Sequence, residues 1–242
     1  MLSKSKNNEA KKVIIGCELL MNNYNPENLT ETQLWLLALG AFLAERNGDR
    51  HDTLYGCEPD DYHIADWKNV LRRDWGINDR QQLFQKLEWL IKEGHRGDFQ
   101  RLNSSFALYS YQEQQRILRE LPSDSPFYNL YQLVNLYGSK LSDAGIAAWD
   151  YGRYISLCRK GAMLKYITDD EAWELMKRIA SDVQTAYPGW YEYGLGYIIG
   201  RIEWQNKLTE VNAHKHVKWL DNFLLKQDGP WVKIDWNTNL EL

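Results

Sequence analysis

Three charged residues fall where helical periodicity predicts a buried, apolar face, and they are the residues of this chain best placed to do chemistry. Asp150 and Arg153 follow Ile146 by four and seven residues, so they share its face of an expected helix. Arg201 lies within a stripe of aromatic residues in the helix expected from about residue 190 to 205. Burying an unpaired charge costs several kcal/mol. We therefore expect these side chains either to pair with one another or to line a cavity.

The structural interpretation is a network of ion pairs among these residues that holds neighbouring helices in register. In this interpretation Arg201 also stacks on Tyr197 or Trp204. Ion-pair networks perturb charged groups as often as functional sites do. The sequence therefore favours this interpretation without excluding the other.

The functional interpretation is a pocket in which Arg153 and Arg201 bind an anionic group and Asp150 orients an arginine. Replacing an arginine separates the two interpretations: a structural network should unfold, whereas a site should stay folded and lose its ligand. The candidate ligand-binding residues are Asp150, Arg153, Arg201, Arg96, Trp149 and Trp204.

Two residues are candidates for proton transfer, His95 and Glu45. His95 and Arg96 follow Gly94, where a helix is expected to end, and the helix dipole favours cations there, which is a sufficient structural account. The functional alternative makes His95 an acid or a base, and that role requires a positioned partner. Glu45 lies near the end of an expected buried helix, beside the polar loop 49–52.

The helices that must position these residues have clear start and stop signals. Thr168 and Glu171 have the spacing of a capping box, and the helix that follows should end at Pro188-Gly189. Thr30 caps an earlier helix whose stretch 34–44 is apolar almost throughout, so it is expected to be buried and to end at Gly48. Further helices are expected over about residues 60–74, 79–92, 111–121, 126–137 and 210–226.

The predicted fold is all-α, a single compact multi-helix domain with an extended C-terminal tail. Its expected parts are an N-terminal segment and first helix (1–28), an all-helical domain (29–226) and the tail (227–242). In the tail, Val232, Ile234 and Trp236 alternate with polar residues, which predicts an extended segment docked on the domain.

Short motifs spread over most of the stretch from Leu34 to Trp204 carry a family resemblance. They are Glu45-Arg46-Asn47-Gly48, His51-Asp52, Trp75-Gly76-Ile77, Glu93-Gly94-His95-Arg96, Ala148-Trp149-Asp150 with Arg153, Tyr166-Ile167, Glu171-Ala172-Trp173, Trp190, and Gly200-Arg201 with Trp204. Together they resemble the bacterial domain-of-unknown-function family numbered twelve sixty-six. The chain departs from the family pattern at Lys165, where glycine is expected, and at Gly189, where serine is expected. The resemblance implies a bacterial origin and a fold, and it implies no activity.

Composition excludes several classes of function. The formal net charge of −4 over 242 residues argues against nucleic-acid binding, which usually selects a strongly basic face. Cys17, Cys57 and Cys158 form neither a disulfide framework nor a metal pair, which indicates a reducing cytoplasm. A lipoprotein cleavage site at Cys17 is rejected because the apolar run before it is too short. No membrane association, metal or cofactor is expected.

The leading prediction for function is a cytoplasmic protein-interaction or accessory module without catalysis, because catalytic motifs are missing and eleven tryptophans suggest a partner-binding surface. The alternative is an enzyme or sensor that binds a small anionic ligand through Arg153 and Arg201. A third possibility is neutralisation of a toxin through an acidic outer face, which the sequence does not separate from the first.

Overall fold

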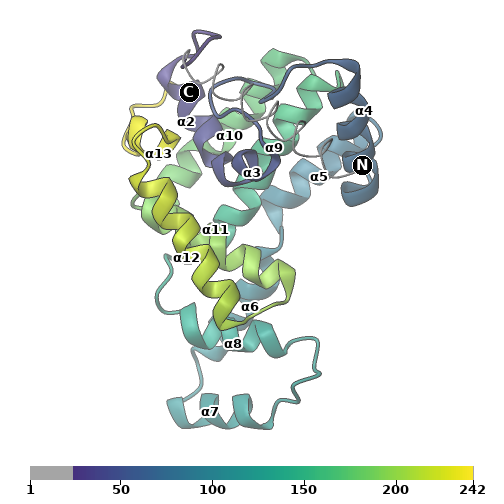
Figure 1. The fold of residues 1–242 in the computed structure, drawn as a ribbon. Helices are drawn as coiled ribbons and strands as arrows, with labels where there is room; N and C mark the ends of the chain where they lie inside the picture. Colours follow the sequence, from purple (N-terminus) through teal and green to yellow (C-terminus); the bar gives the residue numbers. More distant parts are fainter. Residues whose placement is uncertain (1–23, 242) are drawn as a thin grey trace, which may run out of the picture.

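The computed structural model describes residues 24–241, and within this range the chain forms helices and loops without a β-strand (Figure 1). The elements are α2 (Glu31–Leu39), α3 (Ala41–Asn47), α4 (Asp61–Val70), the π-helical turn η1 (Leu71–Trp75), α5 (Arg80–Lys92), α6 (Arg96–Phe106), α7 (Tyr111–Glu120), α8 (Tyr128–Tyr137), α9 (Ala147–Met163), α10 (Asp169–Ala186), α11 (Trp190–Gln205), α12 (Glu210–Leu225) and α13 (Pro230–Lys233). The predicted all-α class is confirmed. The expectations for Cys17 and the first segment of the chain lie outside the described residues.

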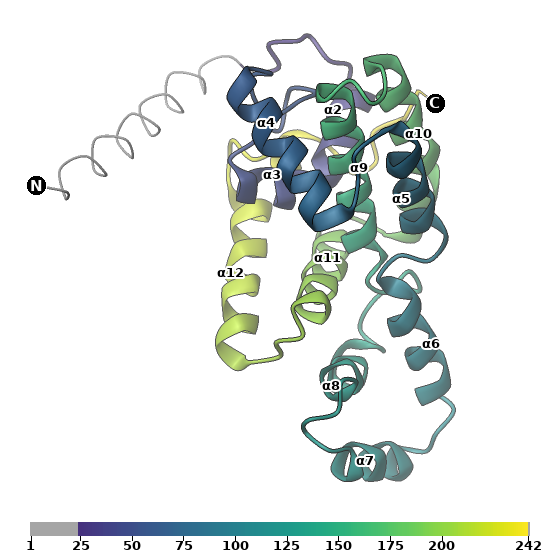
Figure 2. The ribbon, with the colours of Figure 1, turned by 90° about the vertical axis from the view of Figure 1, so that its right-hand side faces the viewer.

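Helix α9 is the centre of the body. It packs against α11, α10, α5, α2 and α3, which surround it in both ribbon views (Figures 1 and 2). Almost every residue of α9 is buried, including Asp150, Arg159 and Lys160. A helix that is covered on all sides must satisfy its charged residues internally. The contacts of α9 therefore determine where the polar groups of this protein can meet.

Helices α6, α7 and α8 form an arm that extends from the body (Figure 2). Helix α7 lies at its far end, packs on α8 and contains no buried residue. Helix α6 was not predicted from the sequence. His95 at its N-cap makes no side-chain capping bond, and among its largely polar residues only Arg96, Phe99 and Phe106 are buried, so neither capping nor periodicity indicated a helix.

The expected helix signals are largely confirmed. Thr30 forms a capping box with Gln33, Thr168 forms one with Glu171, and Gly48 adopts a left-handed C-cap. The apolar stretch 34–44 is buried as expected, but it is divided into two helices at Gly40. A Cβ on Gly40 would lie 3.1 Å from a methyl group of Ile155, so glycine allows the chain to turn close against α9.

The C-terminal tail docks on the body, but not as the alternation of its side chains predicted. Residues 230–233 form the short helix α13, which begins with proline at its first turn. The indole nitrogens of Trp231 and Trp190 donate to the carbonyls of Ala38 and Ile234, and Trp35 donates to the carbonyl of Trp236. Indole hydrogen bonds and ring packing thus decide the conformation of this tail.

We predict that Gly189→Ser stabilises the protein by about 0.3 kcal/mol. Gly189 is the N-cap of α11 and makes no side-chain capping bond, and its backbone is extended, a conformation open to any residue. A serine hydroxyl there could accept from the backbone N–H of Glu192, whose carboxylate would complete a capping box. The measurement is the urea concentration at which half of the protein is unfolded. Gly189→Ala, which lacks the oxygen, should bring no gain; an equal gain from alanine would contradict the capping account.

Candidate functional site

The carboxylate of Asp150 is fully buried and is surrounded by hydrogen-bond donors from the start of α6. Its Oδ1 accepts from the backbone N–H of His95 at 2.9 Å and lies 3.0 Å from Nδ1 of the His95 ring. Its Oδ2 accepts from the backbone N–H of Arg96 at 3.1 Å and from the Arg96 guanidinium at 3.2 Å. Asp150 therefore holds the beginning of α6 against the middle of α9.

Arg96 links this carboxylate to the end of α5. Its guanidinium also donates to the carbonyl oxygens of Leu90 (2.5 Å) and Ile91, which belong to the last turns of that helix. Gly94 connects the two helices with a left-handed backbone, φ +60°, and a Cβ there would lie 2.2 Å from the Asp150 carboxylate. Only glycine fits this position without displacing the buried carboxylate. Arg96, a candidate ligand-binding residue, is thus engaged with protein groups.

Both ring nitrogens of His95 have partners. Nε2 lies 3.2 Å from Nη1 of Arg153. Because a guanidinium only donates, Nε2 must accept, which places the proton on Nδ1, facing Asp150. The ring is therefore neutral in this arrangement and connects the buried carboxylate to Arg153. A proton-transfer role for His95 would require Arg153 to move away from Nε2, and that role stays a prediction.

Arg153 lies against three tryptophan rings. Its guanidinium carbon is 4.3 Å from the ring centroid of Trp75, 4.6 Å from that of Trp149 and 5.3 Å from that of Trp204. The half-buried guanidinium is attracted to the electron-rich ring faces. Burial, reinforced by the charges of Arg201 and Arg46, lowers the pKa of Arg153 to about 10 against the opposing effect of Tyr197 and Asp150, so it remains cationic at neutral pH. Trp149 and Trp204, two of the candidate ligand-binding residues, therefore pack against the guanidinium group of Arg153.

Arg201 is buried and makes different contacts from those expected. Its Nε donates to Nε2 of His216 at 3.1 Å, and its guanidinium carbon lies 5.6 Å from the Trp219 ring, both on α12. Among the described residues, Arg201 stacks on neither of the rings expected, Tyr197 or Trp204, and the Trp204 ring lies against Arg153 instead. Nη1 of Arg201 is buried and has no hydrogen-bond partner in the part of the chain that the structure describes. The expected ion-pair network with Arg153 and Arg201 does not form, because Asp150 pairs with Arg96 and His95.

A third arginine, Arg46 on α3, completes a group that we call the arginine cluster: Arg46, Arg153 and Arg201. Arg46 is exposed, Arg153 is half-buried and Arg201 is buried, and the charge of each one acts on the buried hydroxyl of Tyr197. Burial raises the pKa of Tyr197, and the charges of these three arginines oppose that rise. Burial, together with the charge of Arg46, lowers the pKa of Arg201. Among the side chains that the structure describes (24–209 and 214–241), no carboxylate lies within ion-pair distance of a member of the cluster.

Three buried hydrogen-bond donors beside the arginine cluster have no partner among the described residues: Nη1 of Arg201, the hydroxyl of Tyr197 and the indole N–H of Trp149. The Trp149 and Tyr197 rings pack edge to face, with centroids 5.1 Å apart. A buried donor without an acceptor costs roughly 1–3 kcal/mol. The arrangement is therefore rich in donors and positive charge, and it lacks acceptors.

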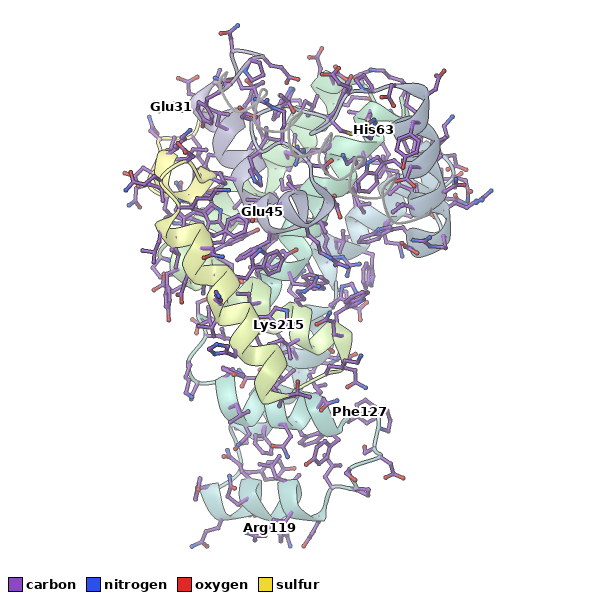
Figure 3. The ribbon with its side chains drawn as sticks, in the orientation of Figure 1. Glu31, Glu45, His63, Arg119, Phe127 and Lys215 are labelled. Atoms are coloured by element: carbon purple, nitrogen blue, oxygen red, sulfur yellow. The ribbon has the colours of Figure 1, made fainter. Side chains whose placement is uncertain are left out.

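Glu45, the other candidate for proton transfer, is exposed on α3 (Figure 3). Its carboxylate lies 3.7 Å from Nε2 of His51, and the contact with His51 is the largest cause that lowers the pKa of Glu45. None of the contacts among the described residues joins Glu45 to His95. The structure therefore places the two proton-transfer candidates in separate surroundings.

Two members of this site were not predicted from the sequence. Arg46 was noted only as part of a motif, and Tyr197 only as part of an aromatic stripe. The spacing of four residues between Tyr197 and Arg201 could have indicated that they lie together on α11. No signal of comparable strength connects Arg46 to them, because that contact depends on how α3 packs against α9.

The described part of the chain contains no group of three or more histidine, cysteine, aspartate or glutamate side chains that could hold a metal ion. The same residues include no helix that is both long and apolar enough to cross a bilayer.

Comparison with known proteins assigns the chain to a family. Residues 70–236 match the family described as "Protein of unknown function (DUF1266)". The chain belongs to this family. The resemblance to this family that the short motifs indicated is thereby confirmed. Glu45, Arg46 and His51, which belong to those motifs, lie outside the matched residues.

Two similar proteins come from Escherichia coli (strain K12). "Uncharacterized protein YbeU" is 30% identical over 143 residues, which span 59% of this chain and 60% of that protein. "Uncharacterized protein YbeR" is 28% identical over 158 residues, which span 65% of this chain and 64% of that protein. The chain thus covers less than two thirds of the length of either relative. No solved structure matches it.

Lys165 stands where the family resemblance led us to expect glycine. Lys165 adopts a left-handed backbone, φ +59°, directly after α9. This conformation favours glycine, which accounts for the glycine expected there in the family. In this chain the Lys165 ammonium donates to the hydroxyl of Tyr55 at 2.6 Å, which contributes a contact that glycine could not make.

Proposed function

We propose that this protein binds a small anionic ligand at the arginine cluster. One observation carries the proposal: Nη1 of Arg201 and the hydroxyl of Tyr197 are buried beside three guanidinium groups, without any acceptor in the described residues. A phosphate or carboxylate group would neutralise the cluster and accept these hydrogen bonds.

The energetic argument is the cost of leaving the cluster empty. The positive charges of Arg46 and Arg201 repel each other, and each of these two charges also lowers the pKa of Arg153. Of the three arginines only Arg201 is buried, whereas Arg153 is half-buried and Arg46 is exposed. A buried guanidinium is normally balanced by a carboxylate, because an uncompensated buried charge is strongly destabilising. Here Asp150 is occupied by Arg96 and His95. The excess of positive charge at the arginine cluster favours the binding of an external anion over a purely structural role for these arginines.

The experiment is a titration with inorganic phosphate, pyrophosphate and citrate, followed by thermal unfolding and calorimetry. We expect at least one of these anions to raise the melting temperature in proportion to the logarithm of its concentration. Arg201→Met and Tyr197→Phe keep the size of the side chain and remove the charge or the hydroxyl. Each should remain folded and bind the anion at least about tenfold more weakly.

The matched control is Arg119→Met, which removes one exposed positive charge on α7, far from the cluster (Figure 3). It should leave anion binding unchanged. The proposal is wrong if none of the three anions stabilises the wild-type protein, or if Arg201→Met and Tyr197→Phe bind as tightly as the control. Unfolding of both variants without ligand would instead support the structural interpretation.

We also propose, as a second candidate, that the arm serves as an interaction surface for a protein partner in an accessory role without catalysis. Leu108 is 87% exposed, Tyr111 74% and Phe127 57%, all on α7 or the loops beside it. Aromatic and aliphatic side chains at this exposure are typical of interface residues. We propose the cytoplasm as the compartment, because Cys57 and Cys158 are free thiols, which a reducing compartment favours.

The test of the second candidate is affinity capture from the source cell with the whole chain, compared with the double variant Leu108→Glu/Tyr111→Glu. We expect a stoichiometric partner that the wild type retains and the variant loses. Since α7 has no buried residue, the variant should unfold at the same temperature as the wild type. Capture of no stoichiometric partner would count against this role.

A further inference from the structure

A second site lies between the arm and the body, where a pocket of about 300 Å³ opens between α6, α8 and the end of α11. It is lined by His95, Asp98, Pro126, Phe127, Leu130, Glu203, Trp204 and Asn206. This volume is at the lower end of the range for small-molecule sites. Phe127 and Trp204 are both about half exposed, so their rings are available to a ligand.

The charged groups of this pocket differ from those of the arginine cluster, because its lining contains no lysine or arginine. Asp98 is paired with Arg101 at 2.6 Å, and His95 is engaged by Asp150 and Arg153. The half-buried carboxyl of Glu203 has no hydrogen bond or ion pair among the described residues. It is thus the one lining carboxyl whose charge the described protein does not compensate.

We propose that this pocket binds the ammonium group of a small amine, with Glu203 as the counter-ion and the rings of Trp204 and Phe127 as apolar walls. An ammonium provides the positive charge and the donors that the Glu203 carboxylate lacks. Aromatic faces attract such a cation as well as its methylene groups. A lysine side chain of a partner protein carries the same chemistry as a free amine.

Ionisation of Glu203 provides a signature for this site. Burial, followed by the charges of Asp98 and Asp150, raises the pKa of Glu203 to about 7. Below that pH the carboxyl is protonated and offers no counter-charge, whereas alkylamines stay cationic up to at least pH 9. Amine affinity should therefore rise about tenfold between pH 6 and pH 8, and binding near pH 6.5 should release protons.

The experiment is calorimetry of the whole chain with putrescine, with the amide-capped amino acid Nα-acetyl-lysine, and with a neutral monosaccharide, at pH 6, 7 and 8. We expect amine binding that strengthens with pH and that releases protons in buffers of different ionisation enthalpy. Tighter binding of putrescine indicates a free amine, and tighter binding of the lysine derivative indicates a partner's side chain. Glu203→Gln should remain folded, since glutamine resembles the protonated carboxyl, and should lose both the affinity and its pH dependence.

Glu174→Gln, which removes an exposed carboxylate on α10, is the matched control and should bind as the wild type does. Arg201→Met should also leave amine binding unchanged. The variant therefore tests the anion proposal separately from the amine proposal. The proposal is overturned if neither amine binds, if Glu203→Gln binds them with unaltered affinity and pH dependence, or if the neutral sugar binds with the same sensitivity to this variant.

Discussion

Replacing Asp150 by asparagine is expected to lower the free energy of unfolding by about 3–5 kcal/mol, because the change leaves a buried arginine without its counter-ion. The Arg96 guanidinium would keep the carbonyls of Leu90 and Ile91 and the Tyr151 ring as partners, and the asparagine NH2 group would face the donors of either His95 or Arg96. Urea unfolding followed by circular dichroism measures the effect.

Asp143→Asn is the control for the Asp150 variant, since Asp143 is exposed and the substitution removes the same charge. It should change the free energy of unfolding by less than about 0.5 kcal/mol. A loss below about 1 kcal/mol for Asp150→Asn would show that the carboxylate is not what joins α6 to α9.

Lys160→Met is the second substitution with a large expected effect, again about 3–5 kcal/mol. The ammonium of Lys160 is 1% exposed and donates to Asp49 at 2.9 Å and to the carbonyl of Tyr55 at 2.7 Å, while it lies 4.3 Å from the Trp67 ring. Methionine fills the same space, but it leaves the buried Asp49 carboxylate without its ion-pair partner, and only the charge of the neighbouring Arg159 remains. Burial lowers the pKa of Lys160, and the charge of Asp49 opposes that effect.

The control for Lys160 is Lys215→Met, at an exposed position of α12 (Figure 3), which should be close to neutral. The double variant Lys160→Met/Asp49→Asn should recover part of the loss, because it removes the uncompensated charge. Additive losses in the double variant would show that the two residues do not interact, contrary to their separation of 2.9 Å.

Arg159 and Lys160 together determine the shape of the loop between α3 and α4. The Arg159 guanidinium donates to the backbone carbonyls of Arg50, Thr53 and Leu54, while Lys160 reaches Asp49 and Tyr55. The loop therefore wraps around two adjacent buried cations of α9. The sequence indicated that this loop is polar, but it did not indicate the role of these cations.

Local signals in the sequence were sufficient to determine most helices of this protein. Capping boxes at Thr30 and Thr168 and the C-cap at Gly48 depend on residues within one turn, so their hydrogen bonds can be inferred without knowledge of the fold. Periodicity likewise predicted that Asp150 and Arg201 are buried, because the face of a helix follows from spacing alone.

Tertiary structure alone decided the partners of those buried charges. Asp150 is paired with groups 54 and 55 residues away, at the start of a helix that the sequence did not reveal. Arg201 meets His216 and the surroundings of Arg46 rather than an acid. Spacing along one helix specifies which way a side chain points, but the group that it meets depends on the packing of other helices. The sequence therefore determined that the helix faces carrying Asp150 and Arg201 are buried, and the tertiary structure decided which groups these two charges meet.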